Sequence, residues 1–165
     1  MDRGWKSLER VNKILNNPKY KEYIKLNEAY ETGREFCRHD LGHFLDVARI
    51  AYILVLENKI NIDKEVVYAA ALLHDIGRWM QYNGNKSHEE GSADLAEDIL
   101  NEAGFAGSEK DLIIDAVRKH RNENLGTENF SSIFYRSDKL SRNCFDCAAA
   151  ECNWNDEKKN LTLKY

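Results

Sequence analysis

The feature that most constrains this chain is a run of small and aliphatic residues that ends in an adjacent histidine and aspartate. The run extends from Tyr68 to Arg78 and reads YAAALLHDIGR. It predicts a buried helix, and Gly77 stands where a helix C-terminus favours glycine. Burying an imidazole beside a carboxylate is costly unless something pairs with both, and a metal ion is the usual partner. Taken alone, His74-Asp75 is better explained as a structural pair that closes a helix.

Length and composition favour one all-α domain, a single helical bundle over residues 1–165. The 165 residues suffice for one hydrophobic core, and 42% hydrophobic with 32% charged residues is ordinary for a globular chain. A single proline, with apolar positions at three- and four-residue spacing, predicts helices throughout.

Charge and targeting signals point to a cytoplasmic protein. The net charge of −4 argues against a nucleic-acid polymer or an anionic membrane as partner. No apolar run approaches the roughly 18 residues of a membrane span, and the first residues lack the apolar core of a signal peptide. Four cysteines without such a signal predict reduced thiols.

Capping residues predict where the helices start and stop. Two amphipathic segments open the chain at 7–16 and 18–32, and Asp40 and Asp63 are expected N-caps of the next two helices.

The second half carries two further start signals. Ser87 and Glu90 fit a capping box for a helix that ends at Gly104, and Ser108 with Asp111 repeats that signal. His88 then lies on the first turn of its helix.

Helical periodicity places six histidines and aspartates at inward-facing positions of five helices. They are His43, His74, Asp75, His88, His120 and Asp138. Each alone is more readily a satisfied core residue, but six would each need a separate buried partner. Shared ions satisfy all of them, and imidazole with carboxylate suits iron, manganese, nickel, cobalt or zinc, one or two per chain. His39 precedes its helix and receives less weight.

The order His43, His74-Asp75 and Asp138 resembles the HD-domain superfamily of metal-dependent phosphohydrolases over about residues 36–142. HFLDVARIA is similar to the family's first-histidine helix, and AALLHDIGR to its signature helix. The segments HEEGSADLA, AVRKH and YRSDKLSR are similar to those of branches with two or three metals, such as dinucleoside tetraphosphate hydrolases and cyclic-dinucleotide phosphodiesterases. The chain lacks the paired histidines and the Gly-Tyr-Pro element of the cyclic-dinucleotide branch, so that substrate is not expected.

The resemblance implies a separate role for each of these residues. His43, His74, Asp75 and Asp138 would hold a first metal, with Asp75 bridging to a second that His88 and His120 complete. Arg78 stands where relatives contact substrate phosphate. Lys139 and Arg142 are weaker phosphate-binding candidates, and their alternative role is ion pairing with Asp138 and neighbouring acids.

The expected reaction is hydrolysis of a phosphoester or phosphoanhydride in a small phosphorylated substrate, a nucleotide in particular, with Asp75 and Arg78 as catalytic residues. Two alternatives stay open. One is an HD-type di-iron oxygenase, which uses the same ligand set, and the other is a non-catalytic metal- or nucleotide-binding module. A homodimer is also left open.

A cysteine cluster near the C-terminus is the other candidate site. Cys144-x2-Cys147-x4-Cys152 starts like a zinc knuckle but offers three thiols, and Cys37 could be the fourth if its segment packs on the tail. The simpler alternative is three half-buried thiols at the end of a helix.

Overall fold

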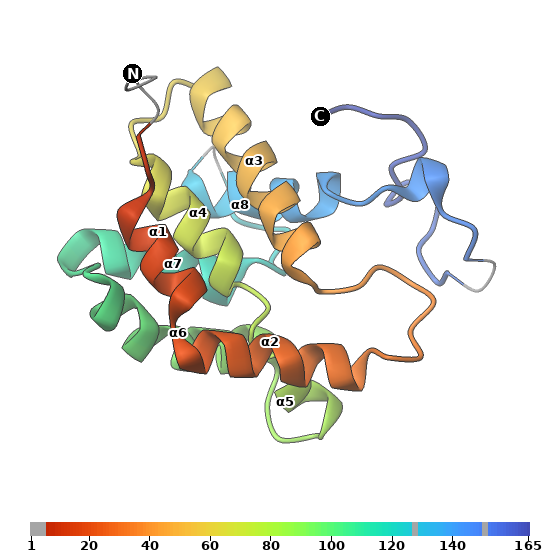
Figure 1. Cartoon of the computed structure of the whole chain (residues 1–165). Helices are drawn as coiled ribbons and strands as arrows, with labels where there is room; N and C mark the ends of the chain where they lie inside the picture. The colour runs from red at the N-terminus through yellow and green to blue at the C-terminus, as the bar shows by residue number, and fades with distance from the viewer. Residues whose placement is uncertain (1–5, 127–128, 150–151) are drawn as a thin grey trace, which may run out of the picture.

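The computed structural model describes residues 6–126, 129–149 and 152–165, and those residues form helices and connections without a strand (Figure 1). The predicted all-α fold is therefore confirmed. The elements are α1 (Glu9–Asn16), α2 (Pro18–Tyr30), α3 (Leu41–Glu57), α4 (Lys64–Leu73), α5 (Arg78–Tyr82), α6 (His88–Ala103), α7 (Gly107–Lys119), α8 (Phe130–Leu140) and the 3-10 turn η1 (Cys144–Asp146).

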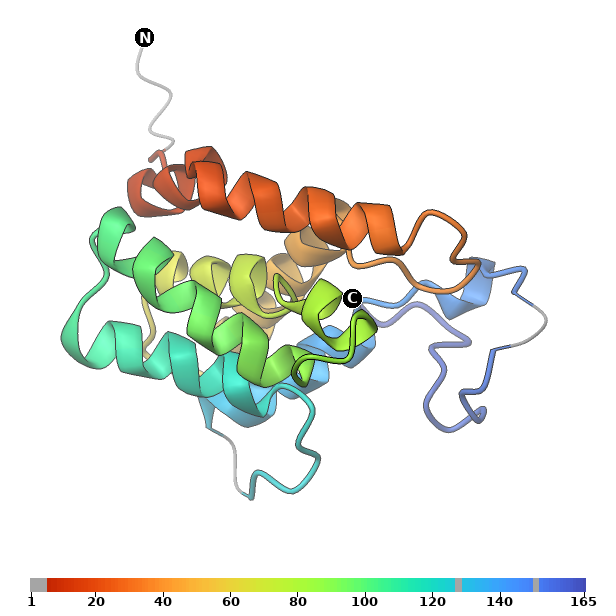
Figure 2. The same cartoon turned by 90° about the horizontal axis from the view of Figure 1, so that it is seen from below.

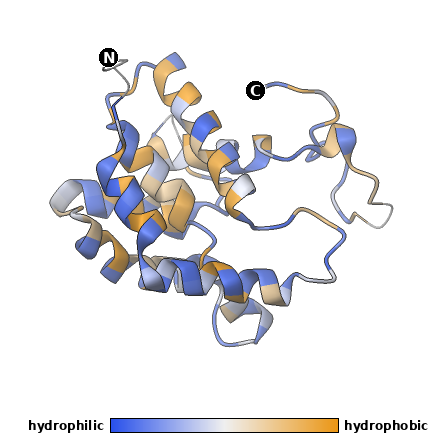
Figure 3. Cartoon of the chain, in the orientation of Figure 1, coloured by the Kyte–Doolittle hydropathy of each residue, from blue (hydrophilic) through white to orange (hydrophobic). Residues whose placement is uncertain are grey.

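Helix α4 is the centre of the bundle. It packs on α3 and α7, and also contacts α1 and α6. Its residues from Ala69 to Leu73 are fully buried, because a run of alanines and leucines presents an apolar surface on every side. Figure 3 shows hydrophobic and hydrophilic residues interspersed along the surrounding helices, and buried apolar residues of α1, α3, α6, α7 and α8 belong to one core with those of α4. The C-terminal end of α4 therefore delivers His74 and Asp75 into the interior.

Two of the predicted helix starts are confirmed by direct capping bonds. The Asp40 side chain accepts a hydrogen bond from the backbone N–H of His43 at 2.9 Å, and α3 begins at Leu41, the residue after Asp40. Asp63 accepts the backbone N–H of Glu65 at 2.8 Å and starts α4. Gly104 ends α6 with a left-handed φ of 92°, as a C-terminal glycine does.

The other two predicted helix starts lack the side-chain capping bonds that were predicted for them. Ser87 occupies the N-cap of α6 but makes no side-chain capping bond, because α5 brings Gln81 to this end, where its Oε1 accepts the N–H of His88. Helix α7 starts at Gly107 rather than after Ser108. Its N-cap residue is Ala106, whose methyl group cannot accept a hydrogen bond. The capping box lies instead at Asn129 and Ser132, at the start of α8.

Gly77 is a glycine for a different reason from the one predicted. Its φ of −94° lies outside the left-handed region. A Cβ at this position would lie 2.5 Å from the backbone nitrogen of Ser92 and 2.7 Å from the backbone carbon of Gly91. The absence of a side chain lets the turn after Asp75 lie directly against α6.

The segment after α8 leaves the bundle and runs beside the loop that joins α2 to α3. Two perpendicular views place these two segments on the same side of the molecule (Figures 1 and 2). Among the helices of the described residues, none is both long and apolar enough to cross a bilayer. Residues of the C-terminal segment and of the α2–α3 loop line the same cavity, together with His43 of α3 and Asp138 of α8.

Candidate metal centre

The first group of candidate ligands joins α3, α8 and the end of α4. Ligand atoms of His43, His74 and Asp75 lie mutually within 4.8 Å. Oδ1 of Asp138 approaches the same point, at 3.4 Å from Nε2 of His43 and 3.7 Å from Nε2 of His74. Two imidazoles and two carboxylates therefore converge, and this donor set suits a first-row divalent metal.

The second group shares Asp75 with the first and adds one histidine each from α6 and α7. Oδ1 of Asp75 lies 3.2 Å from Nε2 of His88 and 3.4 Å from Nε2 of His120. The two histidine nitrogens are 3.1 Å apart. All three side chains are buried. The structure thus brings together all six predicted ligand residues, in two groups that meet at Asp75.

The far nitrogen of each central imidazole is held by a hydrogen bond to an oxygen. Nδ1 of His74 lies 2.7 Å from the carbonyl oxygen of Ala71. Nδ1 of His88 lies 2.5 Å from Oε1 of Gln81. Nδ1 of His120 lies 2.6 Å from the carbonyl oxygen of Val117. A carbonyl oxygen only accepts, so Nδ1 of His74 and of His120 carries a proton and their Nε2 atoms are directed to the centre. Metal-ligating histidines are oriented in this way.

Three buried polar atoms at the centre make no hydrogen bond. They are Nε2 of His43, Nε2 of His74 and Oδ1 of Asp75. Buried polar atoms without a partner are rare and call for an explanation. These three are the atoms that would bind metal ions, so the residues present fit such ions.

The electrostatics keep the carboxylates ionised. Burial opposes ionisation of Asp75 and Asp138, but the surrounding histidines hold both pKa values well below the ordinary range. Burial lowers the pKa of His88 to about 2, which keeps that imidazole neutral. Burial would also lower the pKa of His74, but Asp75 and Asp138 outweigh it and raise the value to about 10. Metal ions would displace a proton held there, since ligands bind deprotonated.

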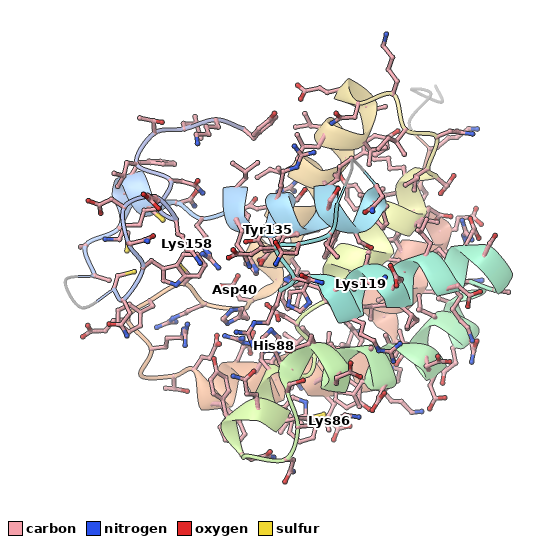
Figure 4. All side chains as sticks on the ribbon, turned by 180° about the vertical axis from the view of Figure 1, so that it is seen from behind. Asp40, Lys86, His88, Lys119, Tyr135 and Lys158 are labelled. Atoms are coloured by element: carbon pink, nitrogen blue, oxygen red, sulfur yellow. The ribbon has the colours of Figure 1, made fainter. Side chains whose placement is uncertain are left out.

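A cavity of about 710 Å³ opens onto both groups. Its lining includes six basic side chains, Arg34, Arg78, Arg121, Lys139, Arg142 and Lys158. Figure 4 shows His88 on α6 facing the side of α8 that carries Tyr135, with Lys158 of the C-terminal segment beyond them. The size is that of an ordinary small-molecule site. Three acidic side chains, Asp75, Glu123 and Asp138, also line it, so basic side chains are in excess.

The predicted phosphate-binding residues differ in how free they are. Nη1 of Arg78 lies 2.9 Å from Nδ1 of His88, at the edge of the second group. Lys139 is bound to Oδ2 of Asp138 at 2.5 Å, which is the ion-pairing alternative. The guanidinium of Arg142 stacks on Trp154, with 3.3 Å from its carbon to the ring centroid. Arg78 is therefore the best placed of the three.

His39 lies at the centre, although its place before a helix predicted only a minor role. Its Nε2 is 3.7 Å from Oδ2 of Asp75. Its Nδ1 lies 2.5 Å from Oε1 of Glu31, a buried carboxylate that also accepts the hydroxyl of Tyr82 at 2.6 Å. The available signal was its position four residues before His43. The carboxylate that orients it is eight residues away across a loop, which periodicity does not link to it.

The comparison with protein families identifies the class. The family model described as HD domain matches residues 40–144. The chain belongs to the HD domain family of metal-dependent phosphohydrolases.

Several curated proteins are similar to this chain. An uncharacterized protein from Clostridium beijerinckii is 43% identical over 159 residues, which cover 96% of this chain and 100% of that protein. Ribonuclease Y from Enterococcus faecalis is 30% identical over 120 residues, 73% of this chain and 21% of the enzyme. Ribonuclease Y from Fervidobacterium nodosum is 29% identical with the same coverage. The chain therefore spans about a fifth of the length of these ribonucleases. No solved structure matches it.

Proposed function

We propose that the protein hydrolyses a phosphoester or phosphoanhydride bond of a small phosphorylated substrate, a nucleotide in particular. The observation that carries the proposal is the joining of two ligand groups through Asp75 at the floor of a cationic cavity. Two divalent ions held there would polarise a phosphate and lower the pKa of water. The likeness to proteins named Ribonuclease Y supports phosphate ester chemistry rather than oxidation of carbon.

The ligand residues have separate tasks in this proposal. His43, His74 and Asp138 would hold one ion and His88 with His120 the other, while Asp75 would be shared by both. The Nδ1 bonds that fix His74, His88 and His120 keep their Nε2 atoms directed inward. Little reorganisation is then required when ions bind, and preorganised groups stabilise developing charge best.

Arg78 would bind the phosphate undergoing attack. It lines the cavity beside the second group, and its guanidinium donates in a fixed fork that matches phosphate oxygens. Arg34 and Arg121 line the same cavity and are suited to further phosphates of a nucleotide, whereas Lys158 is paired with Glu123 at 2.9 Å. Lys139 neutralises Asp138 in the described geometry and is therefore a positioning residue in this proposal.

An anaerobic assay tests the reaction. Protein loaded with manganese, nickel or cobalt is incubated with a panel of nucleotides and a generic phosphoester, and released phosphate or nucleotide is measured. Cleavage without oxygen supports the proposal. Oxygen uptake by the iron-loaded protein, with no phosphate released from any member of the panel, would contradict it and favour the oxygenase.

A further inference from the structure

All four cysteines line one cavity beside the metal centre. This second cavity has a volume of about 570 Å³, and its lining includes Cys37, Cys144, Cys147 and Cys152. Cys37 belongs to the loop between α2 and α3, whereas the other three lie in the segment after α8. Cys37 and Cys147 are exposed, and the remaining two are half-buried. Residues more than a hundred positions apart thus bring their thiols to the same space.

Local backbone geometry pairs two of these thiols. Cys144 begins the 3-10 turn η1, and the N–H of Cys147 donates to the carbonyl of Cys144 at 3.3 Å. Cys147 is the C-cap of this turn, so the turn brings the two cysteines close together along the backbone. A Cys-x2-Cys pair on such a turn is a common half of a structural zinc site.

The thiols of Cys144 and Cys147 are close enough to Cys37 to affect its pKa. Loss of water around its sulfur raises the pKa of Cys37, the guanidinium of Arg142 opposes that rise, and the thiols of Cys144 and Cys147 add to it. A cation shared by neighbouring thiols stabilises their thiolates together.

The C-terminal segment lacks an apolar anchor of its own. Among the described residues, Leu140 is the last hydrophobic side chain that packs on the core. Beyond it, Phe145, Leu161 and Leu163 are exposed. The segment is tied down by polar bonds, including those from Nδ2 of Asn160 to the carbonyls of Lys139 and Arg142. Short extensions without an apolar core are commonly stabilised by a bound metal.

We propose that Cys37, Cys144, Cys147 and Cys152 bind a structural zinc ion that fastens the C-terminal segment to the α2–α3 loop. Four thiolates select zinc over harder divalent metals and leave it no open position for water. Among the described residues the four sulfurs do not form a group with ligand atoms mutually within 4.8 Å, so zinc binding would require them to move closer together. Both segments are loops apart from η1, and convergence breaks no α-helix.

This zinc would also shape the catalytic cavity, although the proposal does not depend on the reaction catalysed there. Cys152 and Cys37 line both cavities. Trp154, two residues after Cys152, forms part of the wall of the larger cavity, where Arg142 stacks on it. The zinc ion would fix that wall at one end, while release of zinc would free it.

Metal analysis of protein purified without chelator or nickel resin tests the proposal. Titration with an organomercurial, which binds thiolates, should release about one zinc ion per chain. Protein loaded with cobalt(II) should show sulfur-to-cobalt charge-transfer absorption in the near ultraviolet, which histidine–carboxylate sites lack. The variant Cys144→Ser/Cys147→Ser should lose this absorption and about one zinc ion. The matched variant His88→Ala/His120→Ala should keep the absorption, since it alters only the HD centre.

Three results would overturn the proposal. These are wild-type protein that shows no charge-transfer absorption with cobalt, a mercurial titration that releases no zinc, and absorption that persists in the double serine variant. The first two measurements use wild-type protein, so a folding defect in the serine variant does not affect them. Failure of the phosphatase assay, in turn, would leave the thiolate absorption unchanged.

Discussion

Oδ1 of Asp75 lies 3.2 Å from Nε2 of His88, while its other oxygen lies 3.2 Å from Nε2 of His74. The two oxygens of one carboxylate thus face different histidine groups, on α6 and at the end of α4. No other described carboxylate belongs to both ligand groups. Loss of Asp75 should therefore affect both groups at once, whereas loss of an outer histidine should affect one.

The first prediction concerns metal stoichiometry. Asp75→Asn should lose metal from both groups, because a neutral amide replaces the shared charge. His88→Ala should lose about one ion per chain and keep the other with His43, His74 and Asp138. Elemental analysis after loading with manganese measures both. Asp111→Asn, at an exposed position of α7, is the matched control and should retain the wild-type metal content. Full stoichiometry in Asp75→Asn would show that this carboxylate does not bridge.

The second prediction separates phosphate binding from metal binding. Arg78→Gln should keep the metal content and lower kcat/KM by roughly 10- to 150-fold, the effect of losing one charge-assisted hydrogen bond of about 1.5–3 kcal/mol. Steady-state kinetics on any substrate found in the panel measures this. Arg118→Gln, whose partner Glu90 is an exposed surface acid, is the control and should be near wild type. A loss of metal in Arg78→Gln would instead assign Arg78 to support of His88.

The fold and the inward direction of the ligand residues were predictable because both depend on local periodicity. His43, His88 and His120 recur in phase with apolar residues of their helices, and a helix directs such positions inward whatever its partner. The division into two groups around Asp75 is a tertiary property, and in the sequence it came from the family resemblance alone.

The remaining features depend on contacts between distant segments. Gly77 is required by the backbone of α6, which no local rule includes. His39 faces the centre because Glu31 and Tyr82 hold it there. Ser87 fits a capping pattern but makes no such bond, because Gln81 from α5 reaches the same helix start. In each case a tertiary contact outweighs the local signal.

The third prediction tests the close approach at Gly77. Gly77→Ala should lower the free energy of unfolding by about 1–3 kcal/mol, because the added Cβ would overlap rigid backbone of α6 rather than a flexible side chain. Urea unfolding followed by circular dichroism measures the loss. Gly33→Ala is the control, since nothing lies within 4 Å of its Cβ, and its change should be within about 0.5 kcal/mol. Equal effects in the two variants would remove the packing explanation.

The last prediction concerns Glu31 and pH. Burial alone would raise the pKa of Glu31, but hydrogen bonds from His39 and Tyr82 lower it to about 2, from an ordinary value of 4.5. Between these values the unfolded chain binds more protons than the folded one. The ionised carboxylate therefore stabilises the fold above about pH 4.5, and this contribution is lost as the pH falls toward about 2.

Glu31→Gln should thus be less stable than wild type by about 1.5–3 kcal/mol at pH 7, since it replaces charge-assisted hydrogen bonds with neutral ones. The difference should narrow as the pH falls below about 4.5, because wild type then loses stability that the variant never had. Urea unfolding at pH values from 7 to below 4 measures the gap. Glu22→Gln, on the exposed side of α2, should match wild type at every pH. A gap that stays constant with pH would show that the charge of Glu31 does not stabilise the fold.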